Sequence, residues 1–235
     1  NIGIKMLKDA GHTVVVSEKD GALTNDELTA AVSEQPYEAL LTLLSDNIDG
    51  TLLQHAPSVK IVANYAVGYN NIDVEELTEK NVIVTNTPGV LNDSVAEFTI
   101  ALMMALTKRI PEADRFTRAG KYDGWAPELL LGCDLRGKTL GVVGAGRIGA
   151  GVAQIASKGL GVKVDYYDIK PCGPLEEAIP CTYVERLEDL LSNADIVTVH
   201  VPLLETTKHL INAERLALMK PTSYLINTSR GPVHD

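Results

Sequence analysis

Short apolar runs alternate with helical segments along the whole chain. Most of these runs are continuous, which is typical of strands covered on both faces by helices. The segments between them open with helix-start signals, as at Thr24-Asn25-Asp26-Glu27 and Asp73-Val74-Glu75-Glu76. Repeated strand and helix predict a parallel sheet with right-handed crossovers. The expected strands are Thr13–Ser17, Ala39–Leu44, Lys60–Tyr65, Val82–Thr85, Thr139–Val143, Lys163–Tyr167, Ile196–Val201 and Ser223–Asn227.

The pattern changes between Asn92 and Val95. Pro88-Gly89 ends one strand–helix series, and a long helix over Asp93–Arg109 is expected next. That helix is apolar on more than one face, so it packs inside the protein or against a second subunit, and we expect a homodimer. A looser segment, Arg118–Gly132, then leads into a fresh strand. We therefore predict two α/β units, residues 1–94 and residues 95–235.

Composition and charge narrow the partners. The chain has 235 residues, of which 45% are hydrophobic and 22% charged, as in ordinary globular proteins. A formal net charge of -10 argues against nucleic acid and against anionic membranes. The most apolar run, Val95–Leu106, is too short to span a bilayer and contains Glu97. Three cysteines without metal-type spacing predict no metal site and a cytoplasmic, reducing location.

Both ends of the sequence suggest a fragment. The chain opens on Asn1 without an initiator Met or a signal-peptide pattern, and it stops at Asp235 soon after an expected strand and turn. We therefore expect a first strand and a sizeable C-terminal part to lie outside these residues.

A glycine turn follows the expected strand Thr139–Val143. Gly144-Ala145-Gly146-Arg147-Ile148-Gly149 has the spacing GxGxxG and opens a helix through Ala156. The first glycine permits a tight turn, the second lets backbone approach a pyrophosphate, and the third lets helix and strand pack closely. The helix N-terminus then supplies unpaired N–H groups to the phosphates. This context predicts a dinucleotide site.

Asp168 ends the next expected strand and is the acidic partner of the glycine turn. A carboxylate there can accept both ribose hydroxyls of NAD and repels the extra phosphate of NADP. The competing interpretation is that Asp168 only caps a turn. Lys170 nearby could tolerate a phosphate, so NAD(H) is preferred and NADP(H) stays open.

The chain resembles the D-2-hydroxyacid dehydrogenases, and in particular their glyoxylate/hydroxypyruvate reductase branch. The motifs that carry the resemblance are spaced over essentially the whole sequence and occur in the family's order. They are Ala63–Asp73, Val84–Gly89, Ser94–Glu97, Gly144–Gly149, Val199–Pro202 with Thr206, and Ile226–Gly231. The fold implied is a Rossmann-type doubly wound parallel sheet plus a flavodoxin-like α/β substrate domain.

The resemblance also implies roles for single residues. Arg230 would be the catalytic arginine, since its fork can bind a planar carboxylate or carbonyl bidentately. Backbone N–H groups of Val67 and Gly68 would bind the substrate carboxylate. The cofactor would be lined by Val95, Gly144, Ala145, Gly146, Arg147, Ile148, Gly149, Asp168, Ile169, Val201, Pro202, Thr206, Thr228, Ser229 and Arg230.

The family's proton donor is a histidine paired with a glutamate, and both follow the arginine motif. By the resemblance that pair lies beyond Asp235, so residues 1–235 alone are expected to lack it and to be inactive, because general acid catalysis contributes about 100- to 10,000-fold. His200 matches a position that faces the cofactor and is not the proton donor, and His234 is not assigned that role.

The expected function is NAD(P)H-dependent reduction of glyoxylate or hydroxypyruvate to the D-2-hydroxy acid. One alternative is a non-enzymatic NAD-sensing protein like the C-terminal-binding-protein corepressors, which share this fold. Phosphite, formate and D-lactate dehydrogenases are the alternatives among enzymes, because a few pocket side chains decide the substrate.

Overall fold

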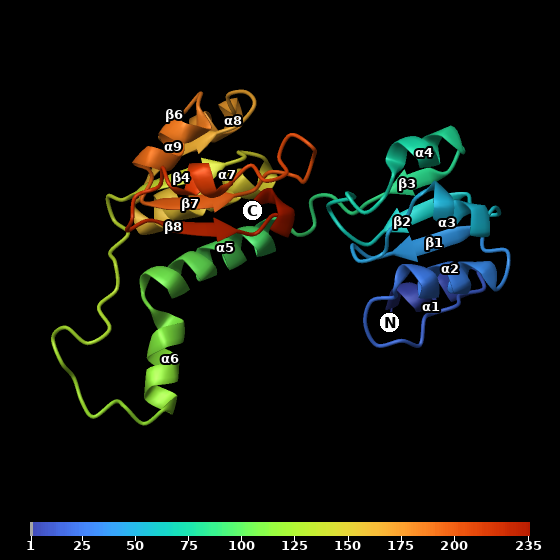
Figure 1. Cartoon of the computed structure of the whole chain (residues 1–235), viewed down its shortest axis with the longest axis horizontal. Helices are drawn as coiled ribbons and strands as arrows, with labels where there is room; N and C mark the ends of the chain where they lie inside the picture. Colours follow the sequence, from blue (N-terminus) through green and yellow to red (C-terminus); the bar gives the residue numbers. More distant parts are fainter. Residues whose placement is uncertain (1) are drawn as a thin grey trace. The chain divides into compact units, whose positions relative to one another are not determined.

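The computed structural model describes residues 2–235, which form two compact units (Figure 1). The first unit ends at Thr87 and the second runs from Pro88 to Asp235. This boundary falls earlier than the one we expected at residue 94. The reason lies in local packing: Thr87 N donates to Ala66 O at 2.9 Å. The helix that begins at Asn92, by contrast, packs on the second unit.

The first unit is a three-stranded parallel sheet with helices. Its elements are α1 (Ile2–Asp9), α2 (Asn25–Ser33), β1 (Ala39–Thr42), α3 (Gly50–His55), β2 (Ile61–Asn64), α4 (Val74–Glu79) and β3 (Ile83–Thr85). The strand order is β1-β2-β3. Helix α2 begins where the sequence predicts it, because Thr24 and Glu27 form a reciprocal capping box. Helix α4 begins after Asp73, whose carboxylate accepts from Glu76 N at 2.9 Å.

The strand expected over Thr13–Ser17 does not form. These residues belong to neither sheet, and the side chains of Val15 and Val16 are 54% and 53% exposed. An apolar β-branched run forms a strand only where a neighbouring strand pairs with it.

The second unit is a five-stranded parallel sheet flanked by helices. Its elements are α5 (Asn92–Thr107), α6 (Ile110–Arg118), β4 (Thr139–Val143), α7 (Arg147–Ile155), the π-helical turn η1 (Ala156–Leu160), β5 (Lys163–Tyr167), α8 (Gly173–Ala178), β6 (Thr182–Tyr183), α9 (Leu187–Asn193), β7 (Ile196–Val199), α10 (Ala213–Leu216), β8 (Tyr224–Asn227) and the 3-10 turn η2 (Gly231–Val233). The two-residue strand β6 was not predicted.

The strand order of the second unit is β6-β5-β4-β7-β8. The chain therefore starts in the middle of the sheet, winds outward to β6, and crosses back to β7 on the other side of β4. Such a reversal is the topological switch point of a Rossmann-type fold, and ligands bind at the carboxyl ends of the strands there. The expectation of a Rossmann-type α/β fold is confirmed.

The expected helix Asp93–Arg109 is interrupted near its end. Helix α5 stops at Thr107, Arg109 has a positive φ of 55°, and α6 starts at Ile110 with Pro111 in its first turn. Within the second unit, α5 lies alongside β8, while α6 and the irregular segment after it project away from the sheet (Figure 1). No helix among residues 2–235 has the length and apolar character needed to cross a membrane.

Candidate functional site

The glycine turn stands at the carboxyl end of β4, on the switch point. Gly144 has a positive φ of 94°, and its N–H donates to Tyr167 O at 2.8 Å. A Cβ on Gly144 would lie 3.0 Å from His200 C and Val201 N. Both the backbone conformation and the close approach of the chain after β7 therefore require glycine here.

The other two glycines of the motif differ in what surrounds them. A Cβ on Gly149 would stand 2.0 Å from Gly144 O, so only glycine lets the first turn of α7 pack on the turn before it. A Cβ on Gly146 would meet no atom within 4 Å. Gly146 therefore borders open space, which is where a ligand's phosphates can approach the backbone.

The N-terminus of α7 is available to an anion. Gly146 is its N-cap and has no side chain to cap the helix. The first intrahelical bond runs from Ala150 N to Gly146 O, so the N–H groups of Arg147 and Ile148 have no partner within the helix. Together with the helix dipole, these donors fit a pyrophosphate.

Asp168 is held in place at the end of β5. Its Oδ2 accepts from Ala145 N at 2.8 Å and its Oδ1 accepts from Ile169 N at 2.7 Å. Each carboxylate oxygen keeps a further lone pair that can accept a ribose hydroxyl. Ile169 beside it is 90% exposed and provides an apolar surface at the same edge. The residues present thus fit the adenosine half of a dinucleotide.

His200 follows β7 and lies in a polar chain that joins three elements. Its Nε2 is 2.8 Å from Thr198 Oγ1, and its Nδ1 is 3.4 Å from Thr228 Oγ1. Thr228 Oγ1 is in turn 3.0 Å from Thr99 Oγ1, which donates to Val95 O at 2.8 Å. Burial lowers the pKa of His200 to about 4, so the imidazole is neutral at physiological pH. Two members of this chain, Thr99 and Thr198, were not anticipated from the sequence.

The loop after β8 carries Arg230 and is braced by Asn227. The Asn227 amide donates to Arg230 O at 2.9 Å, and its oxygen accepts from Ser229 N at 2.9 Å and Ser229 Oγ at 2.7 Å. The half-buried Arg230 also donates from Nη1 to Ser229 O at 2.8 Å. Arg230 thus follows a strand end on the same edge of the sheet as the glycine turn.

The segment after His200 holds the remaining expected cofactor residues. Val201 is half-buried against the core around β7, whereas Pro202 and Thr206 are exposed. The hydroxyl that shapes this loop belongs to the next residue: Thr207 Oγ1 donates to Pro202 O and accepts from Leu204 N at 2.8 Å. Val95 is half-buried in the first turn of α5, beside Ala96, whose Cβ would be 3.3 Å from a Cβ on Gly151 of α7.

In the first unit, the turn Val67-Gly68 is held through its carbonyl groups. Asn86 donates to Val67 O at 2.8 Å, and Asn64 donates to Gly68 O at 2.9 Å. Within residues 2–235, the backbone N–H groups of Val67 and Gly68 donate to no protein acceptor. Two adjacent unused donors fit a carboxylate.

A buried polar cluster supports that turn. Thr42, Asn64 and Asn71 are 3%, 2% and 8% exposed. Thr42 donates to Asn64 Oδ1 at 3.0 Å, and Asn71 donates to the carbonyls of Leu43 and Asp46 at 3.0 and 2.9 Å. The cluster ties the loops after β1 and β2 together. The sequence alone did not separate Asn64 and Asn71 from the motif around them, because their burial is a tertiary property.

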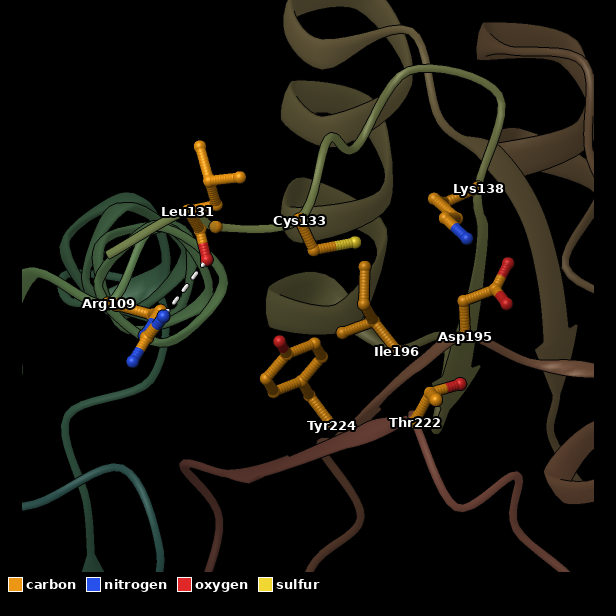
Figure 2. A pocket seen from close by; sticks show the side chains of 9 residues that line it. Arg109, Leu131, Cys133, Lys138, Asp195, Ile196, Thr222 and Tyr224 are labelled. Atoms are coloured by element: carbon orange, nitrogen blue, oxygen red, sulfur yellow. Dashed lines mark hydrogen bonds between the residues drawn. The ribbon is translucent and has the colours of Figure 1, made fainter. Parts of the chain in front are cut away.

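A pocket of about 420 Å³ lies elsewhere in the second unit (Figure 2). Its lining includes Lys138, Asp195 and Thr222, which precede β4, β7 and β8. It therefore opens at the amino ends of the strands, opposite the glycine turn. Arg109 at its rim donates to Leu131 O at 3.3 Å. None of the site residues predicted from the sequence lines it.

The histidines do not form an acid–base pair with glutamate. Among residues 2–235, no histidine side chain has a hydrogen bond or ion pair with a glutamate. His234 Nδ1 is 3.2 Å from Asn227 Nδ2, and His209 Nδ1 is 3.9 Å from an Asp235 oxygen.

Comparison with known proteins agrees with this geometry. Residues 100–235 match the family model of the D-isomer specific 2-hydroxyacid dehydrogenase NAD binding domain. A glyoxylate reductase of Thermofilum pendens is 47% identical over 99% of this chain and 68% of its own length. The chain spans only about 60% of several other glyoxylate reductases that it matches.

Two solved structures extend the likeness to the fold. A protein from Thermus thermophilus has a TM-score of 0.91 and 37% identity over 100% of this chain and 72% of its own. D-lactate dehydrogenase from Aquifex aeolicus, complexed with NAD and lactic acid, has a TM-score of 0.79 and 33% identity over 88% of this chain and 60% of its own. With the glycine turn, Asp168 and the switch point in place, the chain belongs to the D-isomer specific 2-hydroxyacid dehydrogenases, an oxidoreductase family with a nicotinamide dinucleotide-binding domain.

Proposed function

We propose that the protein reduces a small 2-keto acid, glyoxylate or hydroxypyruvate, to the D-2-hydroxy acid. The observation that carries this proposal is the cradle at the switch point of the second unit. There Gly146 borders open space, the first turn of α7 is uncapped, and the Asp168 carboxylate is fixed by two backbone N–H groups. A bound reduced dinucleotide supplies the hydride. The names of the matched reductases support the choice of substrate.

The substrate's carboxylate and carbonyl need separate partners. We assign the carboxylate to the unused N–H donors of Val67 and Gly68 in the first unit. We assign the carbonyl to the Arg230 guanidinium, which follows a strand end on the cofactor edge of the second unit and can donate from two nitrogens at once. The positive charge of the guanidinium next to the carbonyl oxygen stabilises the alkoxide that develops when hydride is transferred.

His200 does not donate the proton in this proposal. Its buried imidazole has a pKa of about 4, and both of its nitrogens already face threonine hydroxyls. A neutral imidazole whose nitrogens are already hydrogen-bonded is too weak an acid to protonate an alkoxide near pH 7.

The activity is tested on the full-length protein by following NADH absorbance, with NADH plus glyoxylate, hydroxypyruvate or pyruvate, and with NAD⁺ plus formate. We expect turnover with at least one of the first two, and loss of about 100-fold in kcat/KM in Arg230→Lys. Arg186→Lys is the matched control, because Arg186 is an exposed arginine at the start of α9. A full-length protein that binds NADH but consumes none with any small 2-keto acid overturns the proposal.

The cofactor choice is a finer part of the proposal. NAD(H) is preferred over NADP(H), because the fixed Asp168 carboxylate would lie against the 2′-phosphate of NADP. Lys170 is exposed and has no ion pair among residues 2–235, so it offers only a screened attraction to that phosphate.

We also propose a homodimer in the cytoplasm. Helix α5, the start of α6 and the irregular segment after α6 expose large apolar residues to solvent. These are Phe98, Leu106, Ile110 and Leu131, which are 58%, 43%, 53% and 61% exposed. A second copy is the occupant that would cover them. Light scattering on a size-exclusion column tests this, and a monomer at micromolar concentration refutes it. The three cysteines are free thiols, as a reducing compartment would keep them.

The corepressor-like alternative is not favoured. The relatives that this chain matches are named as reductases and dehydrogenases.

A further inference from the structure

The contacts along the polar chain through His200 determine which group donates in each hydrogen bond. This polar chain links Thr198 on β7, His200 after β7, Thr228 after β8, and Thr99 on α5, with contacts of 2.8, 3.4 and 3.0 Å. It ends at Val95 O, which accepts from Thr99 Oγ1 at 2.8 Å. Thr99 and Thr198 are fully buried, so water does not offer them other partners. The hydrogens of these two hydroxyls must therefore find their acceptors among the protein groups that they contact.

The direction of each bond follows from the carbonyl end. A carbonyl oxygen only accepts, so the Thr99 hydroxyl hydrogen points at Val95 O. A threonine hydroxyl has one hydrogen, and so Thr99 must accept the hydrogen of Thr228. Because the Thr228 hydroxyl donates its one hydrogen to Thr99, it can only accept from His200 Nδ1. His200 then carries its proton on Nδ1, and its bare Nε2 accepts from Thr198.

The other protonation states are disfavoured by the same contacts. A proton on Nε2 alone would aim the Nδ1 lone pair at the Thr228 oxygen, which has no hydrogen left to give. It would also leave the buried Thr198 hydroxyl hydrogen without an acceptor, at a cost of roughly 1–3 kcal/mol by typical buried groups. The doubly protonated ring would place a charge in a buried position, which lowers the pKa of His200.

We propose that His200 is a positioning residue for the nicotinamide half of the dinucleotide site. Held as the neutral Nδ1–H tautomer, it fixes the hydroxyl of Thr228 and ties the loop after β8 to the first turn of α5. This proposal rests on the proposed function, because it takes Thr228 and Val95 as residues that line the nicotinamide end of the cofactor.

The arrangement has a consequence for what the site can recognise. Thr228 Oγ1 uses its hydrogen on Thr99 and one lone pair on His200, so it can offer a ligand only an acceptor. Val95 O already accepts from Thr99 Oγ1 and, within helix α5, from the Thr99 backbone N–H, so it has no lone pair left for a ligand. The Thr228 hydroxyl therefore selects ligand donors, such as a ribose hydroxyl or a carboxamide N–H, and disfavours ligand acceptors.

The tautomer is tested directly on the unmodified chain. Long-range ¹H–¹⁵N correlation spectra of ¹⁵N-histidine-labelled protein separate a protonated ring nitrogen from a bare one, and His200→Asn assigns the signal. We expect a protonated Nδ1 and a bare Nε2 for His200 at neutral pH. A proton on Nε2 overturns the proposal.

The positioning role is tested by the affinity for NADH, measured by its fluorescence. The amide nitrogen of Asn can replace the Nδ1 donor, whereas Gln reaches only the Nε2 position. We therefore expect His200→Asn to keep the affinity within about 3-fold and His200→Gln to lose about 10-fold, the effect of one buried hydrogen bond. Thr99→Ser and Thr99→Val form a second matched pair with the same expected split.

The outcomes are separable from the failure of the proposed function, because neither measurement needs a keto acid. Equal losses in His200→Asn and His200→Gln overturn the positioning role. The expected split in NADH affinity, found in a protein that reduces no 2-keto acid, supports the positioning role and refutes only the choice of reaction.

Discussion

Replacing Gly149 and Gly146 with alanine, one at a time, separates packing from ligand binding in the same turn. The two glycines are three residues apart and belong to one motif, yet their surroundings differ. A Cβ on Gly149 would lie 2.0 Å from Gly144 O, 3.1 Å from Gly144 C and 3.2 Å from Val142 Cγ1. A Cβ on Gly146 would meet nothing within 4 Å, and its φ of -68° suits any residue.

The expected changes in the free energy of unfolding follow from these contacts. The atom closest to the Gly149 Cβ is backbone and cannot rotate away, so the helix must shift, at about 3 kcal/mol for overpacking of this kind. Alanine also stabilises a helix by about 1 kcal/mol relative to glycine, which offsets part of this cost. Gly149→Ala should therefore lower the free energy of unfolding by roughly 2 kcal/mol, or about 4–8 °C in Tm. Gly146→Ala should change it by less than about 1 kcal/mol.

NADH affinity should reverse this order. In Gly146→Ala the new methyl group would occupy the open space next to the uncapped first turn of α7, so we expect at least about 10-fold weaker binding in a chain of normal stability. Urea unfolding followed by circular dichroism, with NADH titration on the same samples, measures both effects. The reasoning is refuted if Gly149→Ala is as stable as the unmodified chain, or if Gly146→Ala binds NADH normally.

Three further predictions test other parts of the site. Since the pKa of His200 is about 4 in the folded chain and about 6.5 in an unfolded one, the unfolded state binds more protons between these values. The free energy of unfolding should therefore fall by up to about 3 kcal/mol from about pH 7 to about pH 4, and this part should be missing in His200→Asn; equal slopes in urea titrations would contradict it. Asp168→Ser should raise the ratio of NADPH to NADH kcat/KM by at least about 10-fold, and an unchanged ratio would remove Asp168 from cofactor selection. Tyr166→Phe should lower the free energy of unfolding by about 1–2 kcal/mol, because Tyr166 OH bonds Glu176 at 2.5 Å and accepts from Cys172 N at 2.8 Å; Tyr183→Phe, whose hydroxyl makes one longer bond of 3.2 Å, should cost less.

Several elements were readable from the sequence because their signals are local. Strands β4 and β5 have the predicted bounds, Thr139–Val143 and Lys163–Tyr167. Strand β4 is mainly apolar and is followed directly by the glycine turn, whereas β5 alternates charged and apolar residues from Lys163 to Tyr166. Both patterns are defined by the strand's own residues. The glycine turn is equally local, since a strand, three glycines at fixed spacing and a helix follow one another directly.

Other features were misread where pairing or backbone geometry decided them. The apolar run Thr13–Ser17 has the composition of a strand but no neighbouring strand. The break between α5 and α6 depends on the left-handed conformation of Arg109, φ 55°, a residue type that gives no warning of it. Strand β6 is two residues long and exists only through its pairing with Asp165 and Tyr166 on β5.

The sequence by itself determined which residues could hold a dinucleotide, because the turn, the helix start and Asp168 lie within one strand–helix–strand unit. Only the tertiary structure decided how the polar chain through His200 is organised. Thr99 and Thr228 are 129 positions apart and bond at 3.0 Å, because the strand order β4-β7-β8 brings the loop after β8 to α5. The spacing of residues in the sequence does not predict this contact, because the contact arises where a helix packs on a sheet edge that is assembled from distant segments.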